Sequence, residues 1–404
     1  MTQHRQTAEA GQSAGRTGCA WRLVPRIQEF GQTFEEALIA WPYLTAPQCG
    51  AMVAPLPTAA APPHCTQIVT ALVAATGGAA LSLLHFPLAW MIGALVATAA
   101  LGWIRPVAMP GWARPAGLVF LGLSLGATFS GPVLAAVTGA LPALLAAGVV
   151  SIGAGVAVAP LFRHLASTDS RTGFFCSVPG GIIVMAMLAQ QAKVSVATVT
   201  LAQTMRVLVV VLTFPPLLGW LAPHGAYSEF LAPRQAFWLP GLLVMAAVGL
   251  AVAFPLRRLG IANPWMLGPC ALAIGLAATD LLPSGVPMPV VDASQVAMGA
   301  TLGLRLNRSF ILGSRRLVHA SLLAAVALSL LLAAIAVPFA LLAGLPVPAA
   351  ILGLAPGGMP EMALTAKALE LAVPLVLGFH LTRTVLANLL VGPVHRLAVR
   401  LGLL

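Results

Sequence analysis

Long hydrophobic runs, separated by short polar segments, follow one another from Thr66 to the end of the chain. A run of about 20 hydrophobic residues is long enough to cross a bilayer as a helix. Two hydrophobic stretches, 173–191 and 349–368, each carry a Pro-Gly-Gly sequence that would interrupt a helix. The other runs predict ten membrane-spanning helices, over residues 67–84, 88–104, 116–136, 140–162, 195–221, 238–256, 264–281, 293–307, 318–343 and 372–393.

Composition also indicates a helical membrane protein. Of the 404 residues, 59% are hydrophobic and 8% are charged, whereas a soluble domain carries about 25% charged residues. This difference excludes a soluble enzyme, a soluble DNA-binding domain and a disordered chain. The hydrophobic runs are continuous rather than strictly alternating, which argues against a transmembrane β-barrel. The fold class we expect is therefore an all-α polytopic membrane protein.

The chain contains the same unit twice. Trp90-Met-Ile-Gly93 recurs 175 positions later as Trp265-Met-Leu-Gly268, and Gly122-Leu-Ser-Leu-Gly126 recurs 177 positions later as Gly299-Ala-Thr-Leu-Gly303. A fixed offset that joins several uncommon matches indicates duplication rather than chance. The offset of 177 also joins Pro179-Gly180-Gly181 to Pro356-Gly357-Gly358, Met185 to Met362, and Arg206 to Arg383.

Loop charges predict how the two copies are oriented. The basic loops follow the second and fourth spans of the first copy, but the first and third spans of the second copy. Because basic loops lie on the cytoplasmic side, equivalent loops are expected to face opposite sides. We therefore expect an inverted-topology repeat of two five-span units, each with a broken or re-entrant helix at its Pro-Gly-Gly. The expected boundaries are 66–222 for repeat 1, 223–236 for a linker and 237–404 for repeat 2.

Residues 1–65 differ from the remainder because they mix acidic and basic side chains evenly. They lack a hydrophobic run behind a basic start, so we expect no cleavable signal peptide. This segment is interpreted as a polar N-terminal extension, expected to be disordered. The charge pattern predicts a multi-pass protein with both termini cytoplasmic.

The two Pro-Gly-Gly sequences are candidates for a binding site. Proline removes an N–H group and glycine permits non-helical backbone, which a membrane tolerates only where it is buried or lines a cavity. A helix-forming run follows each break, 182–190 and 359–369, and its N-terminus could bind an anion. The alternative is a pair of kinks that serve helix packing.

Ionisable residues inside membrane spans are functional candidates because they are costly in lipid. Arg206 and Arg383 lie near mid-depth, and their partners could be a substrate anion, a carboxylate or the unwound carbonyls. Glu361 could carry a proton or simply stabilise a helix N-terminus. His380 aligns with Gln203 and is either part of a polar pair or a hydrogen-bonded packing residue. The predicted solute site therefore comprises Pro179, Gly180, Gly181, Gln203, Arg206, Pro356, Gly357, Gly358, Glu361, His380 and Arg383.

Other chemistry finds little support in the sequence. The eight histidines are scattered and the five cysteines form no CxxC pair, so no metal site is expected. No phosphate-binding loop and no nucleophile motif occurs, so we expect no cofactor and no enzyme activity. The net charge of +11 is attributed to cytoplasmic loops, and no nucleic-acid partner is expected. Lys193, Lys367 and Glu370 are expected at the membrane interface.

The duplicated motif resembles the AbrB family of bacterial integral membrane proteins. The resemblance covers residues 66–404, and the second copy has the family's Pro-Gly-Gly-x-x-Glu-Met form, whereas the first lacks the acid. It implies a multi-pass protein of the bacterial inner (plasma) membrane. Its relatives are labelled variously as ammonia monooxygenases, regulators of gene expression and transporters. The motifs that carry it are Val178-Pro-Gly-Gly181 with Met185, Gln203 and Arg206, and Ala355-Pro-Gly-Gly-Met-Pro-Glu-Met362 with His380 and Arg383.

The sequence favours a secondary transporter or permease for a small solute, an anion being one candidate, with its site at the paired breaks. The alternative is a membrane-bound sensor or regulator that acts indirectly on gene expression, and a membrane oxygenase is the third hypothesis. The expected partners are the lipid bilayer and a small-molecule solute, and a homo-oligomer stays open.

Overall fold

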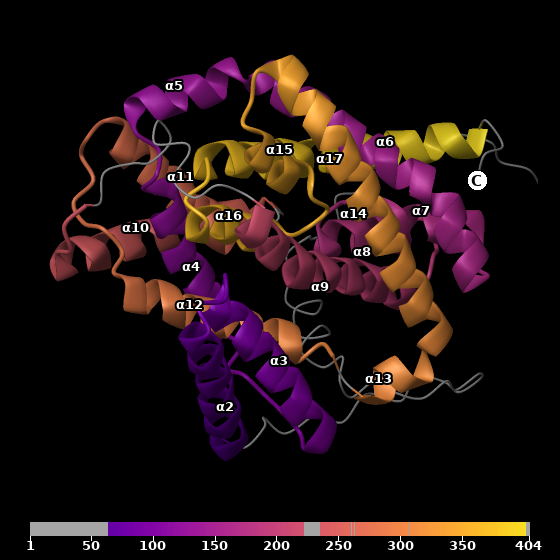
Figure 1. Cartoon of the computed structure of the whole chain (residues 1–404), viewed down its shortest axis with the longest axis horizontal. Coiled ribbons are helices and arrows are strands. Elements are labelled where there is room, and N and C mark those ends of the chain that lie inside the picture. The colour runs from indigo at the N-terminus through magenta and orange to yellow at the C-terminus, as the bar shows by residue number, and fades with distance from the viewer. Residues whose placement is uncertain (1–63, 222–234, 260, 262, 307, 401–404) are drawn as a thin grey trace, which may run out of the picture.

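The computed structural model describes residues 64–221, 235–259, 261, 263–306 and 308–400. Within these ranges the regular elements are sixteen α-helices (Figure 1), which confirms the predicted all-α class. Most of the predicted N-terminal extension (1–65) and of the predicted linker (223–236) lies outside the described residues.

Within the described residues, each half of the chain contributes eight helices in the same order of long and short elements. The first half contains α2 His64–Leu83, α3 Ala89–Ile104, α4 Ala113–Gly126, α5 Gly131–Gly139, α6 Leu141–Ala166, α7 Ser170–Ser177, α8 Ile182–Gln191 and α9 Val196–Leu221. The second half contains α10 Leu239–Arg258, α11 Pro264–Ala278, α12 Met288–Gly303, α13 Arg308–Gly313, α14 Arg315–Ala343, α15 Val347–Leu354, α16 Met359–Ala368 and α17 Val373–Arg400.

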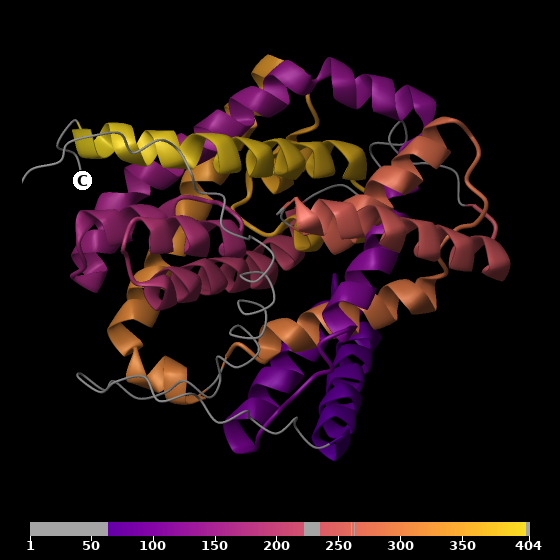
Figure 2. The ribbon, with the colours of Figure 1, turned by 180° about the vertical axis from the view of Figure 1, so that it is seen from behind.

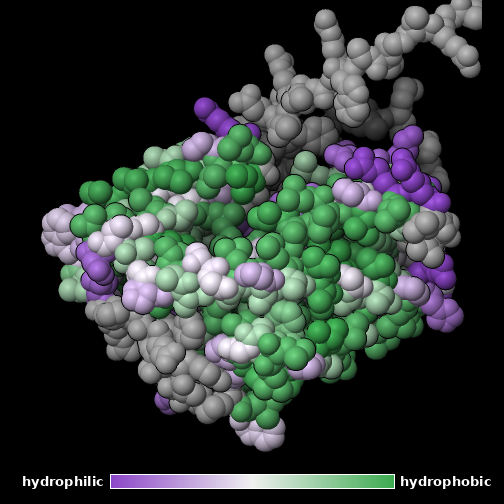
Figure 3. Space-filling model, turned by 90° about the horizontal axis from the view of Figure 1, so that it is seen from above, coloured by the Kyte–Doolittle hydropathy of each residue, from purple (hydrophilic) through white to green (hydrophobic). Residues whose placement is uncertain are grey.

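Six of the described helices, α2, α6, α9, α10, α14 and α17, are long and hydrophobic enough to cross a membrane. Hydrophobic side chains cover most of the face seen in Figure 3, and hydrophilic ones gather at its edges, as expected for a surface in contact with lipid. The protein is therefore a multi-pass membrane protein. The count of ten spans stays a prediction, because α3 and α11 are hydrophobic but shorter.

One predicted span is wrong as a single straight helix. The stretch 116–136 forms two helices, α4 and α5, that meet at an angle of 92° across a short break. A break after Gly126 lets α5 turn away from α4 and lead the chain over to α6 (Figure 1). The hydrophobic pattern could not reveal this bend, because both helices are equally apolar.

The duplication extends to the backbone conformation. Left-handed backbone is rare for residues other than glycine, yet it recurs at equivalent positions of the two halves. The N-cap residues of α3 and α11, the C-cap residues of α6 and α14, and the residues that follow α8 and α16 all adopt it. These pairs are Leu88 and Asn263, Ser167 and Gly344, and Lys193 and Glu370.

Helices from the two halves intermix in two bundles. The first, here called the crossing bundle, contains α2, α3, α4, α10, α11 and α12, and the second, the break bundle, contains α6 to α9 and α14 to α17. Contacts between the halves occur in swapped pairs: α3 packs on α12 as α11 packs on α4, and α6 packs on α17 as α14 packs on α9. In Figures 1 and 2 the α2–α3 pair projects from one end of the molecule.

Small residues allow the helices of the crossing bundle to approach closely. A Cβ atom at Gly122 of α4 would lie 2.4 Å from the carbonyl oxygen of Met266 on α11. At the equivalent Gly299 of α12 it would lie 2.1 Å from the carbonyl oxygen of Met91 on α3. Both glycines begin a Gly-x-x-x-Gly sequence, the pattern that permits close helix packing in membranes. The repeated sequence thus produces the same crossing twice.

Candidate functional site

The two Pro-Gly-Gly sequences break their helices as predicted. Helix α7 ends at Ser177 and α8 begins at Ile182, while α15 ends at Leu354 and α16 begins at Met359. The N-cap residues Gly181 and Gly358 have extended backbone, with φ of −64° and −80°, and neither offers a side chain to cap its helix. Each break therefore leaves the carbonyls of one helix end and the N–H groups of the next helix start in need of other partners.

The two predicted arginines bind the carbonyls at these breaks. Arg206 on α9 donates through Nη1 to the carbonyl oxygen of Val178 and through Nη2 to that of Gly180, both at 3.2 Å. Arg383 on α17 donates in the same way to Ala355 and Gly357, both at 2.6 Å. The sequence separations, 28 and 26 residues, are the same in both halves. Of the three partners considered from the sequence, these bonds match the unwound carbonyls.

Gln203 and His380 also occupy equivalent places. Gln203 Nε2 donates to the carbonyl oxygens of Phe175 (2.9 Å) and Val178 (3.1 Å), and His380 Nε2 lies 3.0 Å from that of Leu352. His380 Nδ1 lies 2.8 Å from Arg383 Nη2. Because guanidinium only donates, Nδ1 must accept, and the imidazole is neutral with its proton on Nε2. His380 is thus a fully buried, hydrogen-bonded side chain.

One hydrogen bond joins the two halves at their breaks. Arg206 Nε donates to the carbonyl oxygen of Pro356 at 2.8 Å, 150 residues away along the chain. Arg206 therefore binds its own break and the other one at once. Val178 and Ala355, the residues that precede the two prolines, are both buried, at 0% and 1% exposure. The breaks meet in the interior of the break bundle instead of facing lipid.

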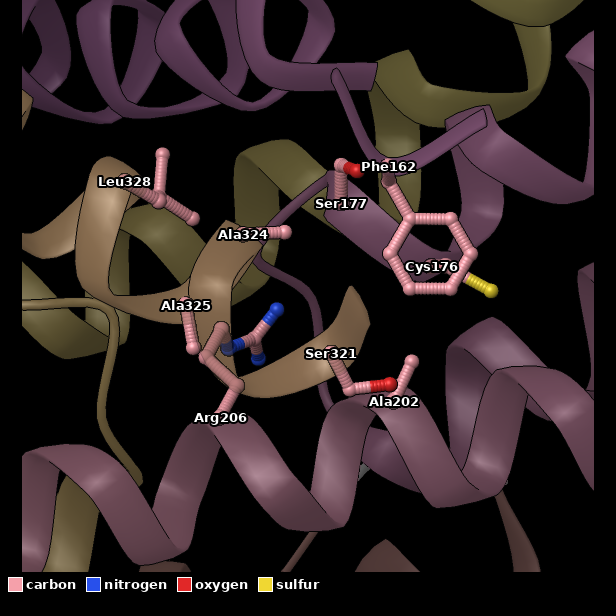
Figure 4. Close-up of a pocket in the computed structure, with 9 residues that line it drawn as sticks. All are labelled: Phe162, Cys176, Ser177, Ala202, Arg206, Ser321, Ala324, Ala325 and Leu328. Atoms are coloured by element: carbon pink, nitrogen blue, oxygen red, sulfur yellow. The ribbon is translucent and has the colours of Figure 1, made fainter. Parts of the chain in front are cut away.

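A small cavity lies beside Arg206. It has a volume of about 10 Å³ and is lined by side chains from α6, α7, α9 and α14. In Figure 4 the Arg206 guanidinium points from α9 into the space between Ala325 of α14 and Ser177 at the end of α7. The hydroxyl of Ser177 is buried there and has no hydrogen-bond partner in the part of the chain that the structure describes. A cavity of this size and polarity has room for about one water molecule.

Glu361 occupies the first turn of α16 and is 3% exposed. Its Oε2 atom folds back toward Gly358, where an added Cβ would lie 2.1 Å from it. Oε2 has no hydrogen-bond partner among the described residues. The carboxylate interacts electrostatically with Arg114 of α4 and Arg305 just after α12.

Arg114 and Arg305 were not among the predicted site residues. Arg114 falls in the loop expected between the spans 88–104 and 116–136, whereas in the structure it is the second residue of α4. The sequence could have indicated Arg305 as a functional candidate, because it is the one charged residue inside the predicted span 293–307. Lys367 makes a contact that the sequence did not predict: it donates to Ser124 of α4, to the hydroxyl and, at 3.3 Å, to the carbonyl oxygen.

Among the described residues, no group of three or more His, Cys, Asp and Glu side chains is arranged to hold a metal ion.

The predicted site residues gather at the two breaks. Those of the second half lie in and around the α15–α16 break, and those of the first half lie in and around the α7–α8 break.

Comparisons with known proteins agree with this architecture. The protein YhjN of Bacillus subtilis, whose name assigns no activity, is 28% identical over 357 residues, which cover 80% of this chain and 91% of YhjN. The Escherichia coli protein named "Putative regulator AbrB" is 25% identical over 315 residues, covering 76% of this chain and 89% of the relative. No solved structure matches significantly.

The family described as "Transition state regulatory protein AbrB" matches residues 90–399. This range includes both breaks, both arginines and Glu361. The match spans most of the chain, so the resemblance of the duplicated motif is confirmed: the protein belongs to the AbrB family of membrane proteins.

Proposed function

We propose that this protein is a secondary transporter or permease that carries a small solute across the membrane along a path at the two Pro-Gly-Gly breaks. The observation that carries the proposal is the Arg206–Pro356 bond, which holds the breaks of both halves together inside one bundle. Broken helices that meet at a repeat interface are the usual construction of a secondary-transporter site. A pair of packing kinks would not need to meet.

The two-bundle architecture supports movement of one part against another. Within each bundle the helices from the two halves pack extensively, whereas the bundles contact each other mainly through α4, which meets α16 and α17. Alternating access in transporters is largely the motion of one such bundle past another around the site. The sparse contact between the bundles would let them shift without unfolding either.

The N-termini of α8 and α16 favour a small anion as the solute. Their first N–H groups have no side-chain cap at Gly181 or Gly358, and helix N-termini attract negative charge. In this proposal Arg206, Arg383, Gln203 and His380 hold the breaks open, and Glu361 contacts the solute or carries a proton. These roles are those of binding, and we propose no catalytic residue.

We further propose that the halves are inverted relative to the membrane plane, in the cytoplasmic membrane of a bacterium with both termini inside. Two copies related by a two-fold axis would pack in swapped helix pairs, such as α3 on α12 and α11 on α4, and the observed pairs support this relation. The loop charges favour an axis in the plane of the bilayer. The partners would be the lipid bilayer and the solute, without nucleic acid.

A second candidate is a membrane sensor that binds the solute without moving it and influences gene expression indirectly. The name of the Escherichia coli relative and the description of the family favour this alternative. A transporter and a sensor would bind the solute at the same site. Only the transporter would also move the solute across the membrane, so a measurement of flux distinguishes them.

Reconstitution in proteoliposomes distinguishes the two candidates. We expect uptake of at least one solute from a panel of small carboxylates and amines, and loss of that uptake in Glu361→Gln. Glu370→Gln makes the same chemical change two residues after α16, at an exposed position, and should leave uptake unchanged. Uptake no faster than in protein-free liposomes for the whole panel would contradict transport, and binding without flux would favour the sensor.

A further inference from the structure

Two arginines and one glutamate, near the ends of three helices, interact electrostatically beside the second break. Glu361 lies in the first turn of α16, Arg114 in the first turn of α4 and Arg305 just after the end of α12. Arg305 interacts electrostatically with both Arg114 and Glu361. The cluster thus sits where the crossing bundle meets the break bundle, the boundary across which the proposed transport motion occurs.

Each member of this cluster keeps a buried polar atom that has no hydrogen-bond partner among the described residues. These atoms are Oε2 of Glu361, Nε of Arg114 and Nη1 of Arg305. A buried polar atom of a charged group is costly to leave unpaired. The two arginine atoms are donors, so the partner that they lack is an acceptor, and their charge favours an anion. Oε2 of Glu361 is itself an acceptor, but it does not pair with them.

The repeat shows that the fold does not need these charges. At the positions related to the cluster by the repeat, the residues are Val184 for Glu361, Val291 for Arg114 and Thr128 for Arg305. The backbone of both halves is alike at the breaks and at the crossing helices. The counterpart of the cluster beside the first break therefore forms without any of the three charges, so their presence beside the second break calls for a different explanation.

We propose that Arg114, Arg305 and Glu361 form the binding site for a small monocarboxylate anion, an inference that rests on the proposed transport function. Two guanidinium groups and one carboxylate carry a net charge of +1, which one singly charged anion neutralises. Guanidinium matches a carboxylate with paired N–H donors, which makes an organic acid a better partner than a spherical halide. The carboxylate of Glu361 lowers the charge of the site from +2 to +1.

Other charged groups near α16 have their own partners. Lys367 on the same helix donates to Ser124, Arg206 on α9 and Arg383 on α17 bind the break carbonyls, and His380 is neutral. None of these replaces the missing partner of the cluster, so the anion is expected to bind Arg114 and Arg305 directly.

The test is the thermal unfolding of the purified full chain in detergent, titrated with acetate, lactate, succinate, chloride or phosphate at constant sodium concentration. We expect acetate or lactate to raise the unfolding midpoint saturably. Arg305→Gln and Arg114→Gln should weaken this binding about 10- to 100-fold, the range for loss of a charged hydrogen bond. Arg308→Gln, an exposed arginine three residues further on, is the matched control and should bind like wild type.

Glu361→Gln gives a second readout that does not require an arginine variant to fold. It raises the charge of the cluster to +2, so it should shift the preference from acetate and lactate to succinate. Absence of saturable stabilisation by either monocarboxylate in the wild type, or equal stabilisation of Arg305→Gln, overturns this site. Flux without such binding would leave the transport proposal standing without this site, whereas binding without flux would support the site and contradict transport.

Discussion

The Nε atom of Arg206, in the first half of the chain, lies 2.8 Å from the carbonyl oxygen of Pro356, in the second half. Among the described residues, Arg383, the equivalent residue, hydrogen-bonds only to its own break and to His380. The two copies are therefore alike in sequence and backbone but not in this contact. Because this hydrogen bond is the asymmetric contact between two otherwise equivalent breaks, its loss would let one break move relative to the other.

Replacement of this arginine should destabilise the protein. Lysine keeps the charge but presents one ammonium group where Arg206 spans three carbonyl oxygens. We expect Arg206→Lys to lower the free energy of unfolding by about 1.5–3 kcal/mol, the value of hydrogen bonds to a charged group. Thermal unfolding in detergent measures it, with Arg308→Lys at an exposed position as control. An unchanged midpoint in Arg206→Lys would show that these bonds do not stabilise the breaks.

The repeat itself supplies a conservative replacement for His380. Gln203 makes the equivalent bond to the carbonyl of Phe175, so His380→Gln retains a donor to Leu352. We expect this variant to unfold within about 1 kcal/mol of wild type, and His380→Leu to lose about 1–3 kcal/mol because it leaves buried groups unpaired. Comparison of the two unfolding midpoints decides the matter. If both variants behaved alike, hydrogen bonding by His380 would have no measurable value.

Close helix crossing predicts a strong effect of one added carbon atom. Gly122→Ala and Gly299→Ala would each place Cβ against a main-chain carbonyl of the crossing helix, and we expect a loss of about 1–3 kcal/mol from overpacking. Gly275→Ala on α11 meets nothing within 4 Å and should be neutral or slightly stabilising through helix propensity. Folding yield and unfolding midpoint are the measurements. Equal tolerance at all three positions would argue against the crossing.

The inverted orientation predicts opposite accessibility of equivalent loops. His85 follows α2 and Arg258 ends α10, and both are exposed at corresponding places in the two halves. In a cysteine-free background, we expect a membrane-impermeant maleimide to label His85→Cys from outside the cell and Arg258→Cys only after the membrane is opened. Labelling of both from the same side would mean that the halves run parallel.

Much of the break geometry was predictable from the sequence. The helices expected over 182–190 and 359–369 are observed as Ile182–Gln191 and Met359–Ala368, because proline and glycine act locally. The offset that paired Arg206 with Arg383 also predicted their equivalent environments. The hydrogen-bond partners of these two arginines were not predictable: a substrate anion, a carboxylate and the unwound carbonyls were all possible. The sequence does not show which backbone groups a helix break leaves unpaired.

The remaining features depend on tertiary packing. Arg114, Arg305 and Glu361 lie far apart in the sequence and meet only because α4, α12 and α16 come together, which no local pattern encodes. The contact of Lys367 with Ser124 has the same origin. The 92° bend between α4 and α5 was missed because hydrophobicity is similar on both sides of it.

The most direct test of the account is a density map of the full chain in a lipid nanodisc, in which the bilayer is visible around the protein. We expect the two Pro-Gly-Gly breaks to lie side by side near mid-depth, with Arg206 reaching Pro356, and the two halves to be related by an axis parallel to the membrane plane. Breaks that lie apart against the lipid, or halves related by an axis along the membrane normal, would contradict it.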